Sequence, residues 1–167
     1  RRVVNVRKRA QRKDKESMEQ LPLMDRALSL LQEGKPVRML RNELDHAELP
    51  LLEGLNLLTS HPVLYVCNVA EADAATGNAH TKAVEEMAAR QGASVVVISA
   101  AIEAEVAQLP DDEEMEFLEA MGLEEAGLDR LIRAGYDLLH LITYFTAGPK
   151  ETRAWTIVKG TKAPQAA

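Results

Sequence analysis

The stretch VLYVCNVAEAD (residues 63–73) decides the fold, because its apolar, strand-like run stops abruptly at an asparagine. A second apolar run, SVVVIS (residues 94–99), follows the segment HTKAVEEMAARQG (residues 80–92), whose apolar positions recur with helical spacing. Strand, helix and strand in this order and length predict a βαβ unit. Neither run alternates apolar with polar residues, which is typical of a parallel sheet covered on both faces.

Polar and small residues follow each predicted strand. The first strand ends at Asn68 and Glu71, and the second at Ser99, Ala100 and Ala101. Ligands of open α/β sheets bind beyond the carboxyl ends of the strands, and small residues let backbone amides approach a planar ring. We therefore predict a nucleobase pocket here. The N-x-x-E spacing is a weak signal, and an ordinary strand-to-loop cap is an equally acceptable interpretation of the spacing alone.

A similar tetrad occurs earlier in the chain. Residues 42–45 read Asn-Glu-Leu-Asp and match N-x-x-D, but no apolar strand precedes them. We therefore discard this tetrad as a base-reading motif.

The N-terminal part of the chain is predicted to be helical. Residues 1–20 lack Gly and Pro, and Val3, Val6 and Ala10 form a narrow apolar stripe that suits one partner helix in a short coiled coil. Pro22 is expected to break this helix. A second helix should follow up to Gly34 and complete a helical hairpin, and residues 49–58 predict a further helix.

The C-terminal part predicts helices and then a hairpin. Helices are expected over residues 101–108, from Pro110 onward, and over residues 128–140. The β-rich runs 142–146 and 153–158 flank a Gly-Pro turn and predict a β-hairpin. A lone hairpin is marginally stable in water, so we expect it to be the start of a further domain.

Composition limits the class of protein. The chain has 167 residues, 46% hydrophobic and 28% charged, which fits one or two small domains. Its longest apolar runs are far shorter than the roughly 20 residues that span a bilayer, so we predict a cytoplasmic protein without a membrane partner. We also expect a monomer. The four histidines show no ligand spacing, and no metal site is predicted.

Charge is concentrated at the N-terminus. Residues 1–16 carry eight Lys or Arg and two acidic residues, whereas the whole chain has a net charge of −6. A basic arm on an acidic body is typical of local contact with nucleic acid. The candidate phosphate contacts are Arg7, Lys8, Arg9, Arg12 and Lys13. The alternative is a solvated face of a coiled coil.

Three stretches together resemble the YchF family of Obg-like ATPases, within the translation-factor class of P-loop GTPases. They are VLYVCNVAEAD, VVVISAAIEAEVAQL and GLDRLIRAGYDLLHLITYFTAGPKETRAWTIVKGTKAPQAA. The resemblance is dense over residues 49–167 and looser before them. It implies an α/β fold: the C-terminal part of a P-loop NTPase parallel sheet (residues 47–140), preceded by a helical coiled-coil insertion (1–46) and followed by the first hairpin of a β-grasp TGS domain (141–167).

The resemblance also assigns roles at the strand ends. It makes Asn68, Val69, Ala70 and Glu71 the counterpart of the Asn-Lys-x-Asp motif, whose aspartate accepts from the ring N–H and the amine of guanine. Adenine has an acceptor at that ring position and would repel such a carboxylate. Glu71 is longer than aspartate, Asn68 can reach N7 and the 6-amino group, and Val69 offers the ring an apolar contact. Ser99, Ala100 and Ala101 would close the pocket. The implied ligand is ATP, in preference to GTP.

One expected motif is missing, because no G-x-x-x-x-G-K-[ST] loop occurs in the sequence. We therefore expect an internal fragment whose catalytic residues and Mg²⁺ ligands lie outside these residues. The implied function is a slow ATPase switch that acts with the ribosome or RNA. The alternative is a non-enzymatic RNA- or protein-binding scaffold that uses the basic N-terminal helix.

Overall fold

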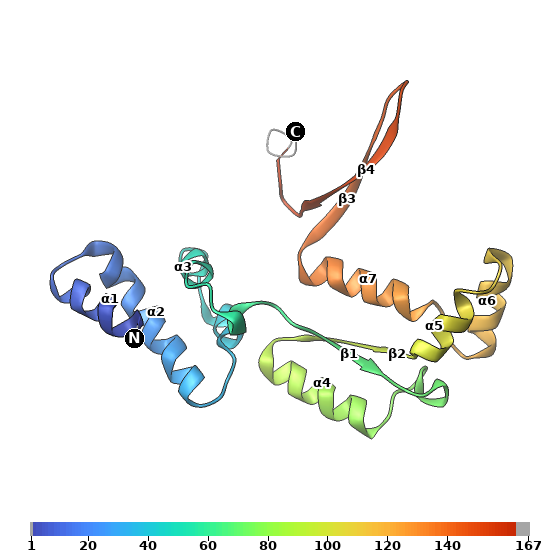
Figure 1. Ribbon diagram of the computed structural model, residues 1–167, viewed down its shortest axis with the longest axis horizontal. Helices are drawn as coiled ribbons and strands as arrows, with labels where there is room; N and C mark the ends of the chain where they lie inside the picture. Colours follow the sequence, from blue (N-terminus) through green and yellow to red (C-terminus); the bar gives the residue numbers. More distant parts are fainter. Residues whose placement is uncertain (1, 163–167) are drawn as a thin grey trace. The chain divides into compact units, whose positions relative to one another are not determined.

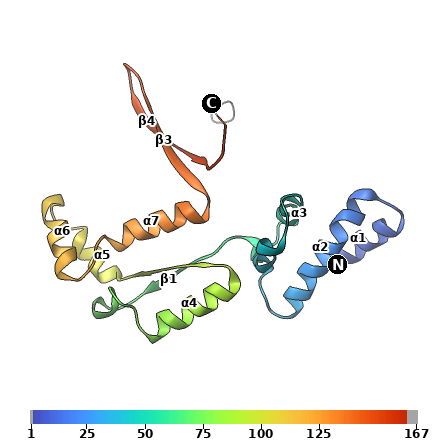
Figure 2. The same cartoon turned by 180° about the vertical axis from the view of Figure 1, so that it is seen from behind.

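The computed structural model describes residues 2–162, apart from the side chain of Asn42. The chain forms two compact units, Arg1–His61 and Pro62–Ala167, whose elements are labelled in Figures 1 and 2. Arg1 of the basic segment and residues 163–167 of the predicted TGS start lie outside the described residues. Compact units need not coincide with domains, so the boundaries at 46/47 and 140/141 stay predictions.

A helical hairpin begins the first unit. Helix α1 (Arg2–Gln11) packs against α2 (Lys15–Gln32), and the turn between them places Lys13 at φ 64°. The predicted break at Pro22 is wrong, because Pro22 lies inside α2. The carbonyl of Met18, which loses its N–H partner to this proline, is on an exposed residue and can bond to water. The hairpin turns instead at Asp14, which caps α2 by accepting from Ser17 N at 3.2 Å.

The core of this unit is apolar and comes from three neighbouring elements. Helix α2 supplies part of it, a 3₁₀ helix (Val37–Glu43) another part, and α3 (Glu48–Gly54) with the residue after it the rest. Helix α3 ends at Gly54, so the helix predicted over residues 49–58 is shorter than expected. Asn56, at φ 49°, follows the end of α3. The buried side chains are Leu23, Met24, Ala27, Val37, Leu40, Leu52 and Leu55.

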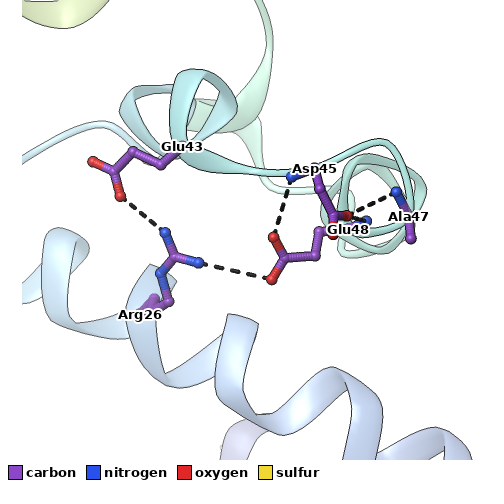
Figure 3. Close-up of polar contacts among 5 residues, drawn as sticks. All are labelled: Arg26, Glu43, Asp45, Ala47 and Glu48. Carbon is purple, nitrogen blue, oxygen red and sulfur yellow. Dashed lines mark hydrogen bonds and ion pairs between the residues drawn. The ribbon is translucent and has the colours of Figure 1, made fainter.

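Polar contacts around Arg26 join these elements (Figure 3). Arg26 lies 2.9 Å from Glu43 and 3.8 Å from Glu48, which connects α2 to the 3₁₀ helix and to α3. Asp45 Oδ1 accepts from the N–H groups of Ala47 and Glu48 at 2.8 and 2.9 Å, and Glu48 accepts from Asp45 N at 3.3 Å. This reciprocal arrangement caps the start of α3. Asp45 of the discarded tetrad therefore has a structural role.

The second unit contains the predicted βαβ unit. Strands β1 (Leu64–Asn68) and β2 (Ser94–Ile98) are parallel, and Asn68 is opposite Ile98. Helix α4 (Ala79–Gln91) connects them and ends at Gly92, whose φ of 62° suits glycine. Helices α4 and α7 (Gly127–Leu138) lie on opposite sides of the two strands (Figures 1 and 2). The prediction of parallel strands is confirmed, whereas coverage of both faces is incomplete, because Val66 of β1 is 45% exposed among the described residues.

Two more helices lie between β2 and α7. Helix α5 (Ala100–Val106) follows β2 directly, and α6 (Asp111–Ala120) begins after Pro110, with four acidic residues in its first turn. Such residues are favourable at the positive end of the helix dipole. A small apolar core joins these helices to the loop after β1; its buried residues are Ala74, Ile102, Leu118, Leu123 and Ala126.

The predicted β-hairpin is confirmed. Strands β3 (Leu141–Ala147) and β4 (Thr152–Val158) are antiparallel. The hairpin contacts the end of α7, where Tyr136 Oη lies 3.1 Å from Thr156 Oγ1. Trp155 is 38% exposed, with the Arg153 guanidinium 4.6 Å above its ring, so it is not buried within the described residues. Assignment of the hairpin to a β-grasp domain stays a prediction.

Among residues 2–162, no helix is long and apolar enough to cross a membrane.

The cap at Asp14 predicts an acid-sensitive helical hairpin. Hydrogen bonds from the Ser17 hydroxyl and N–H hold the pKa of Asp14 below its ordinary value of 3.8. Because this pKa is lower in the folded than in the unfolded chain, the stabilisation is present above about pH 4 and is lost as the pH falls through the folded value. We expect Asp14→Asn, which keeps an acceptor for Ser17, to remove this part of the acid dependence.

The measurement is the thermal midpoint of the helical signal by circular dichroism at pH values above and below 4. Glu19→Gln, an exposed change on the same helix, is the control. Equal acid slopes for the unmodified chain and Asp14→Asn would contradict the prediction.

Candidate functional site

The two parallel strands end side by side. The ladder extends beyond β1, because Val69 N donates to Ile98 O at 2.9 Å. The loop after β1 then forms a short 3₁₀ helix, Glu71–Asp73, while α5 begins immediately after β2. The carboxyl edge of the strands therefore brings the two predicted base-binding segments together.

Asn68 joins the two segments directly. Its side-chain oxygen Oδ1 accepts a hydrogen bond from Ala100 N at 2.9 Å, across 32 positions of sequence. Because the partner is an N–H donor, the amide must present its oxygen to Ala100. The NH₂ group therefore remains to donate to another acceptor, and Asn68 is exposed at this edge. The arrangement can hydrogen-bond the edge of a planar ligand.

Ser99 sits at the end of β2, directly before α5. It is 2% exposed, and its Oγ has no hydrogen-bond partner among the described residues. It occupies the N-cap position of α5 without making a side-chain cap bond. A buried hydroxyl without a partner is uncommon and destabilising. Ala100 and Ala101 follow it and are exposed, with no side chain beyond Cβ to block access to the backbone.

The other predicted members lie close in sequence but make fewer contacts. Glu71 opens the 3₁₀ helix and is exposed, and its carboxylate makes no hydrogen bond within residues 2–162. Val69 is half-buried. Further along the loop, Asn78 donates to Asp73 at 2.8 Å and caps α4. The structure thus brings Asn68 and Ala100 into contact and leaves Glu71 free to turn toward a ligand.

The sequence interpretation missed Glu103. This residue of α5 accepts from Gly127 N at 2.8 Å and from Leu128 N at 2.9 Å, and so caps the start of α7. A signal was present, because α7 begins at Ala126-Gly127, which offer no capping side chain of their own. No local pattern, however, identifies a carboxylate 24 residues away as the partner.

The basic segment lies in the other unit, on α1 and the turn after it. Arg7 is not a free cation, because it pairs with Asp25 of α2 at 2.7 Å. The four remaining candidates are exposed; they are Lys8, Arg9, Arg12 and Lys13. They can offer positive charge to phosphates without first breaking an ion pair of the kind that Arg7 makes.

Comparisons with known proteins agree on one family. A family model described as "YchF-GTPase_C: Protein of unknown function (DUF933)" matches residues 141–167. The "Ribosome-binding ATPase YchF" of Pasteurella multocida (strain Pm70) is 46% identical over 165 residues, which cover 99% of this chain and 45% of that protein. The protein of the same name from Bacillus subtilis (strain 168) is 43% identical over 168 residues, with the same two shares.

A solved structure agrees with these sequences. The YchF GTPase of Schizosaccharomyces pombe matches 91% of this chain and 40% of its own length, with a TM-score of 0.77 and 30% sequence identity. This match confirms the predicted α/β fold class, with its parallel strands and antiparallel hairpin. The chain spans less than half the length of the curated relatives that it matches. Over the part of the family that it spans, the chain belongs to the YchF family.

Proposed function

We propose that this chain forms the base-binding part of an ATPase that binds and slowly hydrolyses ATP as a ribosome-associated switch. The observation that carries the proposal is the hydrogen bond from Ala100 N to Asn68 Oδ1, because it directs the asparagine NH₂ group outward at the carboxyl edge of the strands. The names of the relatives, ribosome-binding ATPases, support the same function. An ATPase that acts with the ribosome would be cytoplasmic, and we propose a monomer.

The NH₂ group of Asn68 suits a purine. Atom N7 is a hydrogen-bond acceptor in both adenine and guanine, and pyrimidines lack it. With its oxygen already bonded to Ala100, Asn68 selects a purine better than it distinguishes adenine from guanine. The preference for ATP therefore depends on the neighbours: Glu71 in place of the usual aspartate, the apolar side chain of Val69, and the small residues 99–101.

The phosphates and Mg²⁺ are assigned to residues of the intact protein outside this chain. Its 167 residues contain no phosphate-binding G-x-x-x-x-G-K-[ST] loop. Among the described residues, no group of three or more His, Cys, Asp or Glu side chains is placed to hold a metal ion. We therefore assign the residues of this chain to the base and not to the triphosphate. Mg²⁺ would supply charge neutralisation at the phosphates during hydrolysis.

Asn68→Asp tests base binding. The carboxylate still accepts from Ala100 N but no longer donates, and it faces the lone pair of N7. We expect ATP to bind about tenfold or more weakly, which corresponds to about 1.4 kcal/mol, with the melting temperature of the intact protein unchanged. The measurement is ATP affinity by calorimetry. Asn56→Asp, the same change at an exposed site of the helical unit, is the control. Unaltered ATP affinity in Asn68→Asp would refute base binding by Asn68.

Glu71→Asp combined with Val69→Lys tests the choice of base. The double change restores the guanine-reading residue types, so we expect the ratio of ATP to GTP affinity to fall by about tenfold, as one charge-assisted hydrogen bond predicts. Competition of the two nucleotides on the intact protein measures this ratio. A ratio that does not move would remove residues 69–71 from the base pocket.

The exposed cations of the basic segment support contact with ribosomal RNA, and the alternative function, a scaffold without ATPase activity, would use the same surface. Lys8→Gln with Arg12→Gln removes two charges, one on α1 and one in the turn after it. We expect weaker ribosome binding and a log–log salt slope smaller by up to about 2.

The matched control is Lys82→Gln with Arg90→Gln, which removes one Lys and one Arg from exposed positions of α4. Equal losses in both double variants would exclude a specific role for the basic segment. A scaffold would lose all its binding in the first variant and would show no affinity for ATP.

A further inference from the structure

The side chain of Glu103 connects α5 to α7 by hydrogen bonds, and no other side chain described in the structure does so. Its two carboxylate oxygens accept from Gly127 N and Leu128 N, the first two N–H groups of α7, at 2.8 and 2.9 Å. These donors have no partner within their own helix. A carboxylate is favoured at this position, because it faces the positive end of the helix dipole.

Any side chain at position 127 would crowd this contact. Gly127 is buried, and a Cβ atom there would lie 2.6 Å from Glu103 Oε1 and 3.0 Å from Ile98 Cγ2. The start of α7 is therefore packed against both the carboxylate and the last residue of β2. Glycine permits this approach because it has no side chain.

The same residue reaches the base-binding segment through its backbone. Glu103 N donates to Ser99 O at 3.0 Å, in the first turn of α5. Ala100, the residue after Ser99, donates its N–H to Asn68 Oδ1. Three consecutive links thus run from the N-terminus of α7, through the first turn of α5, to the side chain of Asn68.

We propose that Glu103 is a positioning residue for the purine base. By bonding the start of α7, it fixes the first turn of α5 and so the direction of the Ala100 N–H, which in turn orients the NH₂ group of Asn68. The proposal rests on the proposed function of Asn68. It assigns Glu103 no contact with the nucleotide.

Glu103→Gln in the intact protein tests this role, with Glu105→Gln as the control because Glu105 is an exposed residue of the same helix. The glutamine side chain has one oxygen that can accept from an N–H group of α7, and its NH₂ group cannot accept from the other. The connection between α5 and α7 is therefore weakened. We expect ATP to bind roughly threefold to tenfold more weakly, the size of coupling between members of one hydrogen-bond network. Inorganic tripolyphosphate, which has no base, should bind with unchanged affinity, both ligands being measured with Mg²⁺.

A merely structural role would lower the affinity for both ligands equally, and that outcome, or an unchanged affinity for ATP, would overturn the proposal. Gly127→Ala gives a second test, because its methyl group displaces the carboxylate without changing charge. We expect Gly127→Ala also to lower the affinity for ATP and to leave the affinity for tripolyphosphate unchanged. An ATP affinity equal to that of the unmodified protein would contradict the proposal.

Asn68→Asp separates this inference from the function on which it rests. If Asn68→Asp lowers the affinity for ATP and Glu103→Gln does not, the positioning role of Glu103 is refuted, whereas base binding by Asn68 is retained. If neither change affects ATP, base binding itself fails.

Discussion

One hydrogen bond, from Ala100 N to Asn68 Oδ1, gives the carboxyl edge of the strands its chemical character. Without it, the loop after β1 and the start of α5 would be joined by the last bond of the ladder and by the apolar contacts of Ala74. With it, two segments 32 positions apart in sequence hold one amide group in a defined direction. Orientation matters here because an asparagine side chain can both donate and accept, and only the donor end matches N7 of a purine.

The surrounding structure maintains this geometry by packing and by capping. Helices α4 and α7 pack against the two strands, and Gly127 allows α7 to approach the end of β2 closely. Glu103 then bonds α7 to the helix that carries Ala100. The other end of α7 contacts the hairpin through Tyr136 and Thr156. A single helix thus contacts both the base-side segment and the hairpin that the family model matches, within one compact unit.

The parts of the fold that depend on local pattern were predictable. Unbroken apolar runs at 63–67 and 95–98 predicted parallel strands, and the Gly-Pro turn predicted the hairpin, because strand propensity and turn chemistry are encoded within a few residues. Pro22 misled the helix prediction, since an exposed proline costs a helix one backbone bond that water can replace. The turn at Asp14 is encoded by a capping residue that the sequence interpretation missed. Asn68 and Ala100 could be named as site residues, but their contact, and the role of Glu103, depend on tertiary structure.

The central claim is that the strand ends bind a purine and prefer adenine, and competition on the unmodified intact protein tests it most directly. ATP, GTP and CTP would each displace a labelled adenine nucleotide in the presence of Mg²⁺. The account predicts that ATP competes best, GTP less well and CTP least, because CTP lacks the N7 acceptor for Asn68. Equal competition by all three would show that the phosphates alone are recognised, and the edge formed by Asn68 and Ala100 would then be only a cap at the end of two strands.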